Sequence, residues 1–200
     1  MASNGGPVDY EVRFGYDGPF TATARGLVHS PGTAGTVADD PTDGACSLTA
    51  PNAQLIPVVI PAGTTYARFA TFDADVNAGA DVDLCVFQGT TLVGSSGTAT
   101  SAEQVNFVFA NPTGGAIPLT VVVQGWGVEG STPFKLHQWN IGAASAGNLA
   151  VTAPAEAITG GTGTITVTPA AGLAAGRWLG SVVYGGSAGM PNPTIVSVTK

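Results

Sequence analysis

The stretch Asp83-Leu-Cys-Val-Phe-Gln-Gly-Thr-Thr-Leu-Val-Gly94 decides the fold class. Residues 83–88 are strongly apolar and β-prone, Gly89-Thr90 is a two-residue turn, and residues 91–94 are suited to pair back on the first run. The stretch therefore predicts a β-hairpin.

Further strand signals extend in both directions from this hairpin. An N-terminal hairpin is expected from 10–14 and 20–24, and residues 30–54 are expected to form a long loop or a few very short strands. The remaining predicted strands are 55–60, 66–72, 104–109, 119–126, 134–141, 149–152, 163–168, 177–184 and 194–198. In 104–109, Val105, Phe107 and Phe109 alternate onto one face. Strands at this spacing, joined by turns, are typical of β-sandwiches and jelly rolls.

The glycine- and alanine-rich stretch 142–147 predicts a domain boundary. We expect residues 1–7 to be an artificial or disordered start, and 8–50 to hold the N-terminal hairpin and a loop. Residues 51–142 are expected to form a jelly-roll or β-sandwich domain, and 143–200 a smaller immunoglobulin/fibronectin-III-like β module. One interpretation pairs the N-terminal hairpin with this C-terminal module, since both need strand partners.

The composition excludes several classes of protein. Only 10% of the residues are charged, while the chain has 29 glycines and 14 prolines, which argues against a helical bundle. The net charge is −7 and the six basic residues are scattered, so nucleic-acid binding is not expected. No apolar run approaches the ~20 residues that span a bilayer, so no membrane span is expected. Residues 1–6 do not resemble a signal peptide.

The two cysteines, Cys46 and Cys85, favour a single disulfide and hence a secreted protein. The alternative is a pair of buried free thiols.

No catalytic residue set is visible, so the chain is not expected to be an enzyme by itself. It contains two histidines, His29 and His137, and no Gly-x-Ser-x-Gly motif. It also lacks a cluster of histidines and cysteines at zinc spacing.

The acidic segment 73–83 is the candidate metal site. Its oxygen-bearing residues suit calcium, which prefers carboxylate and carbonyl ligands. The candidate calcium ligands are Asp73, Asp75, Asn77, Asp81 and Asp83. An EF-hand is excluded because Ala78 and Leu84 stand where that loop needs glycine and glutamate. The alternative is a solvated turn without metal.

Two other features deserve a prediction. The acidic stretch 39–43 is interpreted as a plain solvated loop. Trp126 lies between Gly125 and Gly127 at an expected loop edge, and is the candidate for surface recognition.

Several motifs in order resemble the pre-peptidase C-terminal jelly-roll region of bacterial subtilisin-like serine peptidases. They are Ile60-Pro-Ala-Gly-Thr-Thr-Tyr-Ala-Arg-Phe69, Phe72-Asp-Ala74, Asp81-Val-Asp-Leu-Cys-Val-Phe87, Val93-Gly-Ser-Ser96, Thr100-Ser-Ala-Glu-Gln-Val105 and 120–126. The flanks 14–20, 26–27, 147–154, 178–180 and 194–198 resemble neighbouring segments of the same large secreted enzymes. Cys85 departs from the aromatic residue expected in that strand, which supports a pairing with Cys46 particular to this branch.

The resemblance implies a non-catalytic accessory region that follows a catalytic domain in the same chain. Such regions aid substrate attachment, stability or secretion and maturation, and the implied partners are the upstream catalytic domain and an insoluble protein substrate. The alternative is a free-standing β-sandwich module that binds carbohydrate or another surface.

Overall fold

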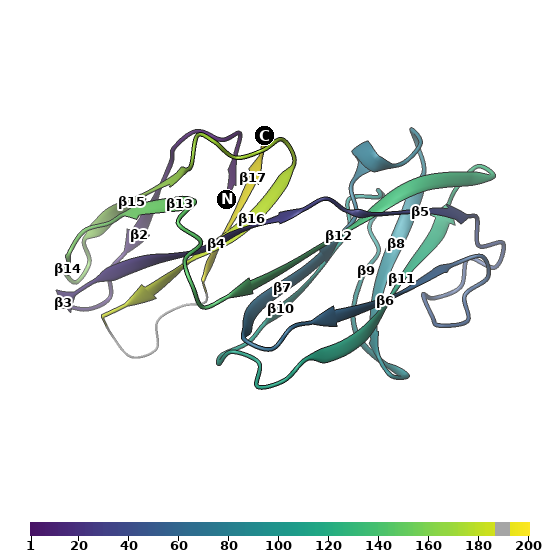
Figure 1. The fold of residues 1–200 in the computed structure, drawn as a ribbon, viewed down its shortest axis with the longest axis horizontal. Helices are drawn as coiled ribbons and strands as arrows, with labels where there is room; N and C mark the ends of the chain where they lie inside the picture. Colours follow the sequence, from purple (N-terminus) through teal and green to yellow (C-terminus); the bar gives the residue numbers. More distant parts are fainter. Residues whose placement is uncertain (187–192) are drawn as a thin grey trace. The chain divides into compact units, whose positions relative to one another are not determined.

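The computed structural model describes residues 1–186 and 193–200, and nearly all of its regular structure is β-strand (Figure 1). The predicted all-β class is confirmed, with antiparallel sheets packed as sandwiches. Within the described ranges, no helix is long and apolar enough to cross a membrane. The chain divides into two compact units: unit 1 contains 1–30 and 141–200, and unit 2 contains 31–140.

Unit 2 is built from two four-stranded sheets, with strand orders β10-β7-β12-β5 and β6-β11-β8-β9. Its elements are β5 (Thr33–Ala38), β6 (Gln54–Ile60), β7 (Thr64–Ala70), the 3₁₀ turn η1 (Asp73–Asp75), β8 (Asp81–Gln88), β9 (Thr91–Ser96), β10 (Gln104–Val108), β11 (Ile117–Gly127) and β12 (Ser131–Gly142). The last two residues of β12 fall in unit 1.

The core of unit 2 lies between these sheets because both contribute apolar side chains at alternate positions. Phe69 on β7 and Phe134 on β12 meet the row Leu119, Val121 and Val123 on β11. The predicted face of 104–109 is confirmed: Val105 is in the core, and Phe107 and Phe109 pack against it.

The hairpin predicted from 83–94 is also confirmed. β8 and β9 pair antiparallel, and Gln88 opposes Thr91, so Gly89 and Thr90 form the turn. Gly89 has φ +59°, a conformation that costs glycine little.

Unit 1 is assembled from both ends of the sequence. Its strands are β1 (Ala2–Ser3), β2 (Val8–Arg13), β3 (Gly18–Pro19), β4 (Thr21–Ser30), β13 (Leu149–Thr152), β14 (Glu156–Ala157), β15 (Thr162–Pro169), β16 (Arg177–Gly185) and β17 (Thr194–Thr199). The sheets have strand orders β1-β17-β16-β4 and β13-β15-β2, with a small β14-β3 pair. Leu27, Val182 and Val196 from the first sheet share a core with Leu149 and Val167 from the second.

The predicted N-terminal hairpin is wrong. β2 pairs with β15, whereas β4 pairs with β16 in the other sheet. The chain between them crosses from sheet to sheet, and Phe14 and Phe20 at the crossing are both buried, with ring centroids 5.0 Å apart. A hairpin would join β2 and β4 through a tight turn. The segment between them instead buries Phe14 and Phe20 and contains β3, which pairs with β14.

Two other expectations differ from the structure. Residues 1–7 are not a disordered start, since β1 pairs parallel with β17 and the Met1 amino group donates to Ile195 O at 2.7 Å. Residues 33–38 form a full strand, β5, paired with β12. A Cβ at Gly35 would lie 2.4 Å from the Phe134 ring, so the glycine makes room for that aromatic side chain.

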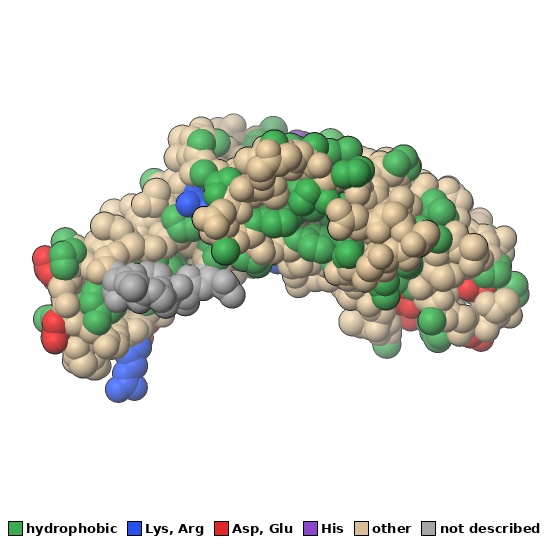
Figure 2. All heavy atoms as spheres, turned by 90° about the horizontal axis from the view of Figure 1, so that it is seen from below, with side chains coloured by type: hydrophobic (Ala, Val, Ile, Leu, Met, Phe, Trp, Pro, Cys, Tyr) green, Lys and Arg blue, Asp and Glu red, His purple; other side chains and the backbone are tan. Residues whose placement is uncertain are grey.

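The unit boundaries therefore fall at 30/31 and 140/141 and not at the predicted 50/51 and 142/143. Residues 31–50 belong to unit 2 because β5 pairs with β12 and Cys46 is bonded to β8. The face seen in Figure 2 carries mostly hydrophobic and uncharged side chains, in keeping with the low content of charged residues.

Candidate functional site

The disulfide between Cys46 and Cys85 is confirmed, with a Cα–Cα distance of 6.3 Å. Cys85 lies on the outer face of the β6-β11-β8-β9 sheet, opposite the core, where it clusters with Phe87 and Val122. Cys46, Leu48 and Ala53 pack over this cluster. The disulfide thus fixes the segment 39–53 across part of the outer face.

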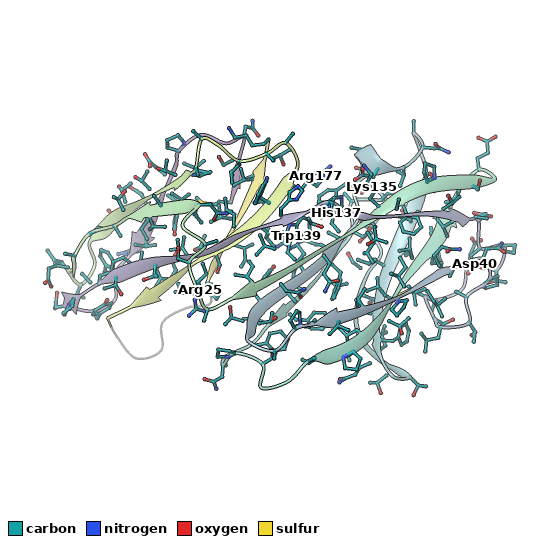
Figure 3. All side chains as sticks on the ribbon, in the orientation of Figure 1. Arg25, Asp40, Lys135, His137, Trp139 and Arg177 are labelled. Carbon is teal, nitrogen blue, oxygen red and sulfur yellow. A yellow bond between two sulfur atoms is a disulfide. The ribbon has the colours of Figure 1, made fainter. Side chains whose placement is uncertain are left out.

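Asp40, which is labelled in Figure 3, fixes the start of the same segment and is fully buried. Its carboxylate accepts hydrogen bonds from Thr42 N (2.9 Å), Thr42 Oγ1 (2.7 Å) and Gln124 Nε2 (2.6 Å). The bonds from Thr42 hold the pKa of Asp40 below its usual range. The interpretation of 39–43 as a plain solvated loop is therefore wrong for Asp40, which is a structural anchor.

The candidate calcium ligand Asp75 lies on η1, and its carboxylate is directed to β12. Its oxygens lie 3.5 Å from Lys135 Nζ and 3.4 Å from His137 Nε2. Figure 3 labels both of these β12 residues. Asp73, on the same 3₁₀ turn, is exposed.

Asn77 is bound to the start of β12. Its N–H donates to Thr132 Oγ1 at 2.8 Å, and its side-chain amide donates to Ser131 O at 3.1 Å. These bonds give Asn77 a structural role in holding the turn 77–80.

Asp81 and Asp83 lie at alternate positions of β8, on the outer face. Burial raises the pKa of Asp83 to about 6, with further contributions from Asp81 and Glu103. The pKa of Asp81 is raised first by burial and then by the charges of Glu103 and Asp73. Asp81 Oδ1 is buried and has no hydrogen-bond partner within 1–186 and 193–200.

Glu103 belongs to this acidic group and is absent from the predicted set. It is 1% exposed and accepts hydrogen bonds from Thr98 N (2.6 Å), Thr98 Oγ1 (2.6 Å) and Ser96 Oγ. The sequence marks Glu103 in one way: it directly precedes the alternating run 104–109 in a chain with few charged residues.

Across residues 1–186 and 193–200, no three His, Cys, Asp or Glu side chains are arranged to hold a metal ion. Of the five predicted ligands, Asp75 and Asn77 are directed to β12. The other three are neighbouring like charges, since Asp73 raises the pKa of Asp81 and Asp81 raises that of Asp83. Calcium binding stays a prediction, which titration calorimetry at millimolar calcium tests directly.

Trp126, the predicted recognition residue, lies on a β-bulge and is 39% exposed. Gly125 opposes Val82 and Gly127 opposes Asp81, which leaves Trp126 as the extra residue. Asp40 N donates to Gly125 O at 2.8 Å, and a Cβ at Gly125 would lie 2.4 Å from Ala38 O. The bulge that presents the indole therefore packs closely against residues 38–40.

An apolar strip on the outer face of the β6-β11-β8-β9 sheet was not predicted. We define it as four exposed residues at the β6 edge, Leu55, Pro57, Val59 and Pro118, together with the exposed Leu92 on β9 at the opposite edge of the sheet. The β6 members face outward because Ile56, Val58 and Ile60 pack on the core. Pro118 opposes Val59 across the β6–β11 ladder, and Leu92 opposes Phe87, which belongs to the outer-face cluster. Leu55, Val59 and Leu92 are 46%, 49% and 49% exposed.

No protein-family model matches the chain, and no curated protein matches it. Among solved structures, the chain is similar to dimeric latent PorU from Porphyromonas gingivalis at 10% sequence identity. The similarity covers 90% of this chain and 22% of that one, with a TM-score of 0.19. The chain thus spans about a fifth of that protein's length, and a TM-score this low carries no argument about fold or function.

Proposed function

We propose that this chain is the non-catalytic accessory region of a secreted subtilisin-like serine peptidase, and that it attaches the enzyme to insoluble protein substrate. The apolar strip is the observation that carries the proposal. The ordered motifs that resemble the accessory region of these peptidases support the choice of parent enzyme. The disulfide supports an oxidising, extracellular compartment.

The strip suits attachment because its side chains are exposed on a rigid support. The ladder of β6, β11, β8 and β9 holds them in place, and the disulfide-bonded segment packs on the same face. None of the five side chains is charged, so the surface they would complement is apolar. Burying the exposed part of a Leu or Val contributes about 1 kcal/mol, so several such contacts give weak, additive adsorption.

Adsorption to insoluble protein tests this role. The purified chain is expected to bind fibres such as collagen or keratin, and the L55S/V59S/L92S variant should lose most of that binding. I158S is the matched control, because Ile158 is 68% exposed and lies in unit 1. Equal adsorption of the triple variant and the wild type, both shown folded by melting, would exclude the strip as the attachment surface.

The parent enzyme is tested separately. The gene is expected to encode a catalytic domain with Asp, His and Ser motifs upstream of residue 1. Hydrolysis of peptide or glycoside by the purified chain, abolished by one substitution, would contradict the non-catalytic role.

Trp126 favours one alternative function, carbohydrate binding. An exposed indole presented by a β-bulge can stack on a sugar ring. Retention on chitin or cellulose but not on protein fibres, lost in W126A, would replace the attachment proposal with this alternative.

A further inference from the structure

A hollow of about 330 Å³ lies in unit 2 between the turn 77–80 and the connection from β11 to β12. Its lining residues are Asn77, Ala78, Gly79, Ala80, Val128, Glu129 and Thr132. The hollow is distinct from the apolar strip, none of whose residues lines it.

Hydrogen bonds join the two walls, so the hollow is formed before any ligand arrives. Asn77 bonds to Thr132 and to Ser131 across the gap, at 2.8 and 3.1 Å. The turn is closed by Ala80 N donating to Asn77 O at 3.1 Å, and Ser101 Oγ donates to Ala80 O at 2.8 Å. On the opposite wall, Val128 is 6% exposed and packs in the core.

The lining is more polar than apolar, and it combines backbone and side-chain polar groups with a few methyl groups and a single charge. Ala78, Ala80 and Val128 supply methyl groups, and Glu129 is the lining residue that ionises. Glu129 is exposed at the tip of the connection, and no basic residue contributes to the lining. Asp81 directly follows Ala80, and the whole chain carries a net charge of −7. The surroundings therefore favour a cation.

A side chain with a short aliphatic stem and a hydrogen-bonding cationic end matches this mixed lining, because the methyl groups can contact the stem while the polar groups and Glu129 face the charged end. Lysine and arginine bury their methylene stems against apolar walls while the charged end stays near water. Either end can pair with the Glu129 carboxylate through charge-assisted hydrogen bonds.

We propose that this hollow binds a lysine or arginine side chain presented by another protein, with Glu129 as the pairing carboxylate. The site depends on neither the apolar strip nor the identity of the parent enzyme. It would add selectivity for basic protein segments to whatever the apolar strip contacts.

The test is an NMR titration of the full chain with N-acetyl-lysine methylamide and its uncharged analogue N-acetyl-norleucine methylamide. The lysine probe is expected to shift amide signals of 77–80 and 128–132, and the norleucine probe to bind more weakly. E129Q should weaken lysine binding by about fivefold, the size expected for an accessible ion pair. Raising the salt concentration should weaken wild-type binding in the same direction.

E156Q is the matched control, because Glu156 is an exposed carboxylate in unit 1. A second variant, A78L, should block the hollow to both probes without removing charge. The proposal is overturned if norleucine binds as well as lysine, if E129Q behaves like E156Q, or if the shifts lie elsewhere.

Discussion

Asp83 shares the outer face of β8 with Asp81 and lies near Glu103, and this placement makes stability depend on pH. Its pKa is about 6 in the folded chain, against 3.8 for an ordinary aspartate. Because the folded value is the higher one, folding favours the protonated carboxyl. The resulting stabilisation is present below about pH 4 and is lost as the pH rises through about 6.

We therefore expect D83N to unfold at higher urea concentration than the wild type at pH 7.5, by about 1 kcal/mol after solvent screening. The difference should shrink toward pH 4.5, where Asp83 is protonated in the folded wild type. Urea unfolding in EDTA from pH 4.5 to 7.5 measures both trends, and D9N serves as an exposed control. A gap that is independent of pH would contradict the assignment.

The acidic residues also show how far the sequence predicts individual side chains. Asp39 and Asp40 are adjacent residues of the same type, yet only Asp40 is fully buried. Gln124, 84 positions away in the sequence, donates a hydrogen bond to the buried carboxylate. Glu103 is likewise enclosed by Ser96 and Thr98. Such environments depend on the register of distant strands, which local patterns do not specify.

At the scale of elements, prediction succeeded where the partner was adjacent in sequence. The turn at Gly89-Thr90 forces β8 and β9 together, so one local signal determines the pairing. The segments 10–14 and 20–24 carry a similar signal, but their partners are β15 and β16, more than 140 residues later. Alternation identified the strands, and it does not encode which distant strand each one joins.

The disulfide-bonded segment 39–53 gives the prediction at this scale. Cys46 and Cys85 are 39 positions apart, and closing such a loop stabilises the fold by about 3–4 kcal/mol on the chain-entropy model. We expect C46S/C85S to lose stability of this order and to expose Phe87 and Val122, which the segment covers. Urea unfolding measures the loss.

Hydrogen exchange should locate the same effect. Backbone amides of 39–53 and of β8 are expected to lose protection before those of unit 1. Uniform loss of protection across both units would contradict a local role for the disulfide.

At the scale of the whole molecule, the sequence of unit 2 is inserted into the sequence of unit 1. Unit 2 occupies a continuous range, 31–140, with its own core between two sheets. Unit 1 takes residues from both ends, and its β15 and β16 each need an N-terminal partner, β2 and β4. Leu27 and Ala24 of β4 also belong to its core.

This arrangement predicts different outcomes for two fragments. A fragment of 31–140 should fold cooperatively, because every strand of its two sheets except the last residues of β12 is present. A fragment of 141–200 should stay unfolded, because it lacks β2 and β4 and leaves the facing edges of β15 and β16 and the core side chains Val167 and Val182 uncovered. Circular dichroism and urea titration distinguish a cooperative transition from its absence.

Adding a peptide of residues 1–30 to the second fragment should restore structure, since that peptide supplies both missing strands. Cooperative unfolding of 141–200 alone would contradict this prediction, because it would mean that the C-terminal strands fold without β2 and β4.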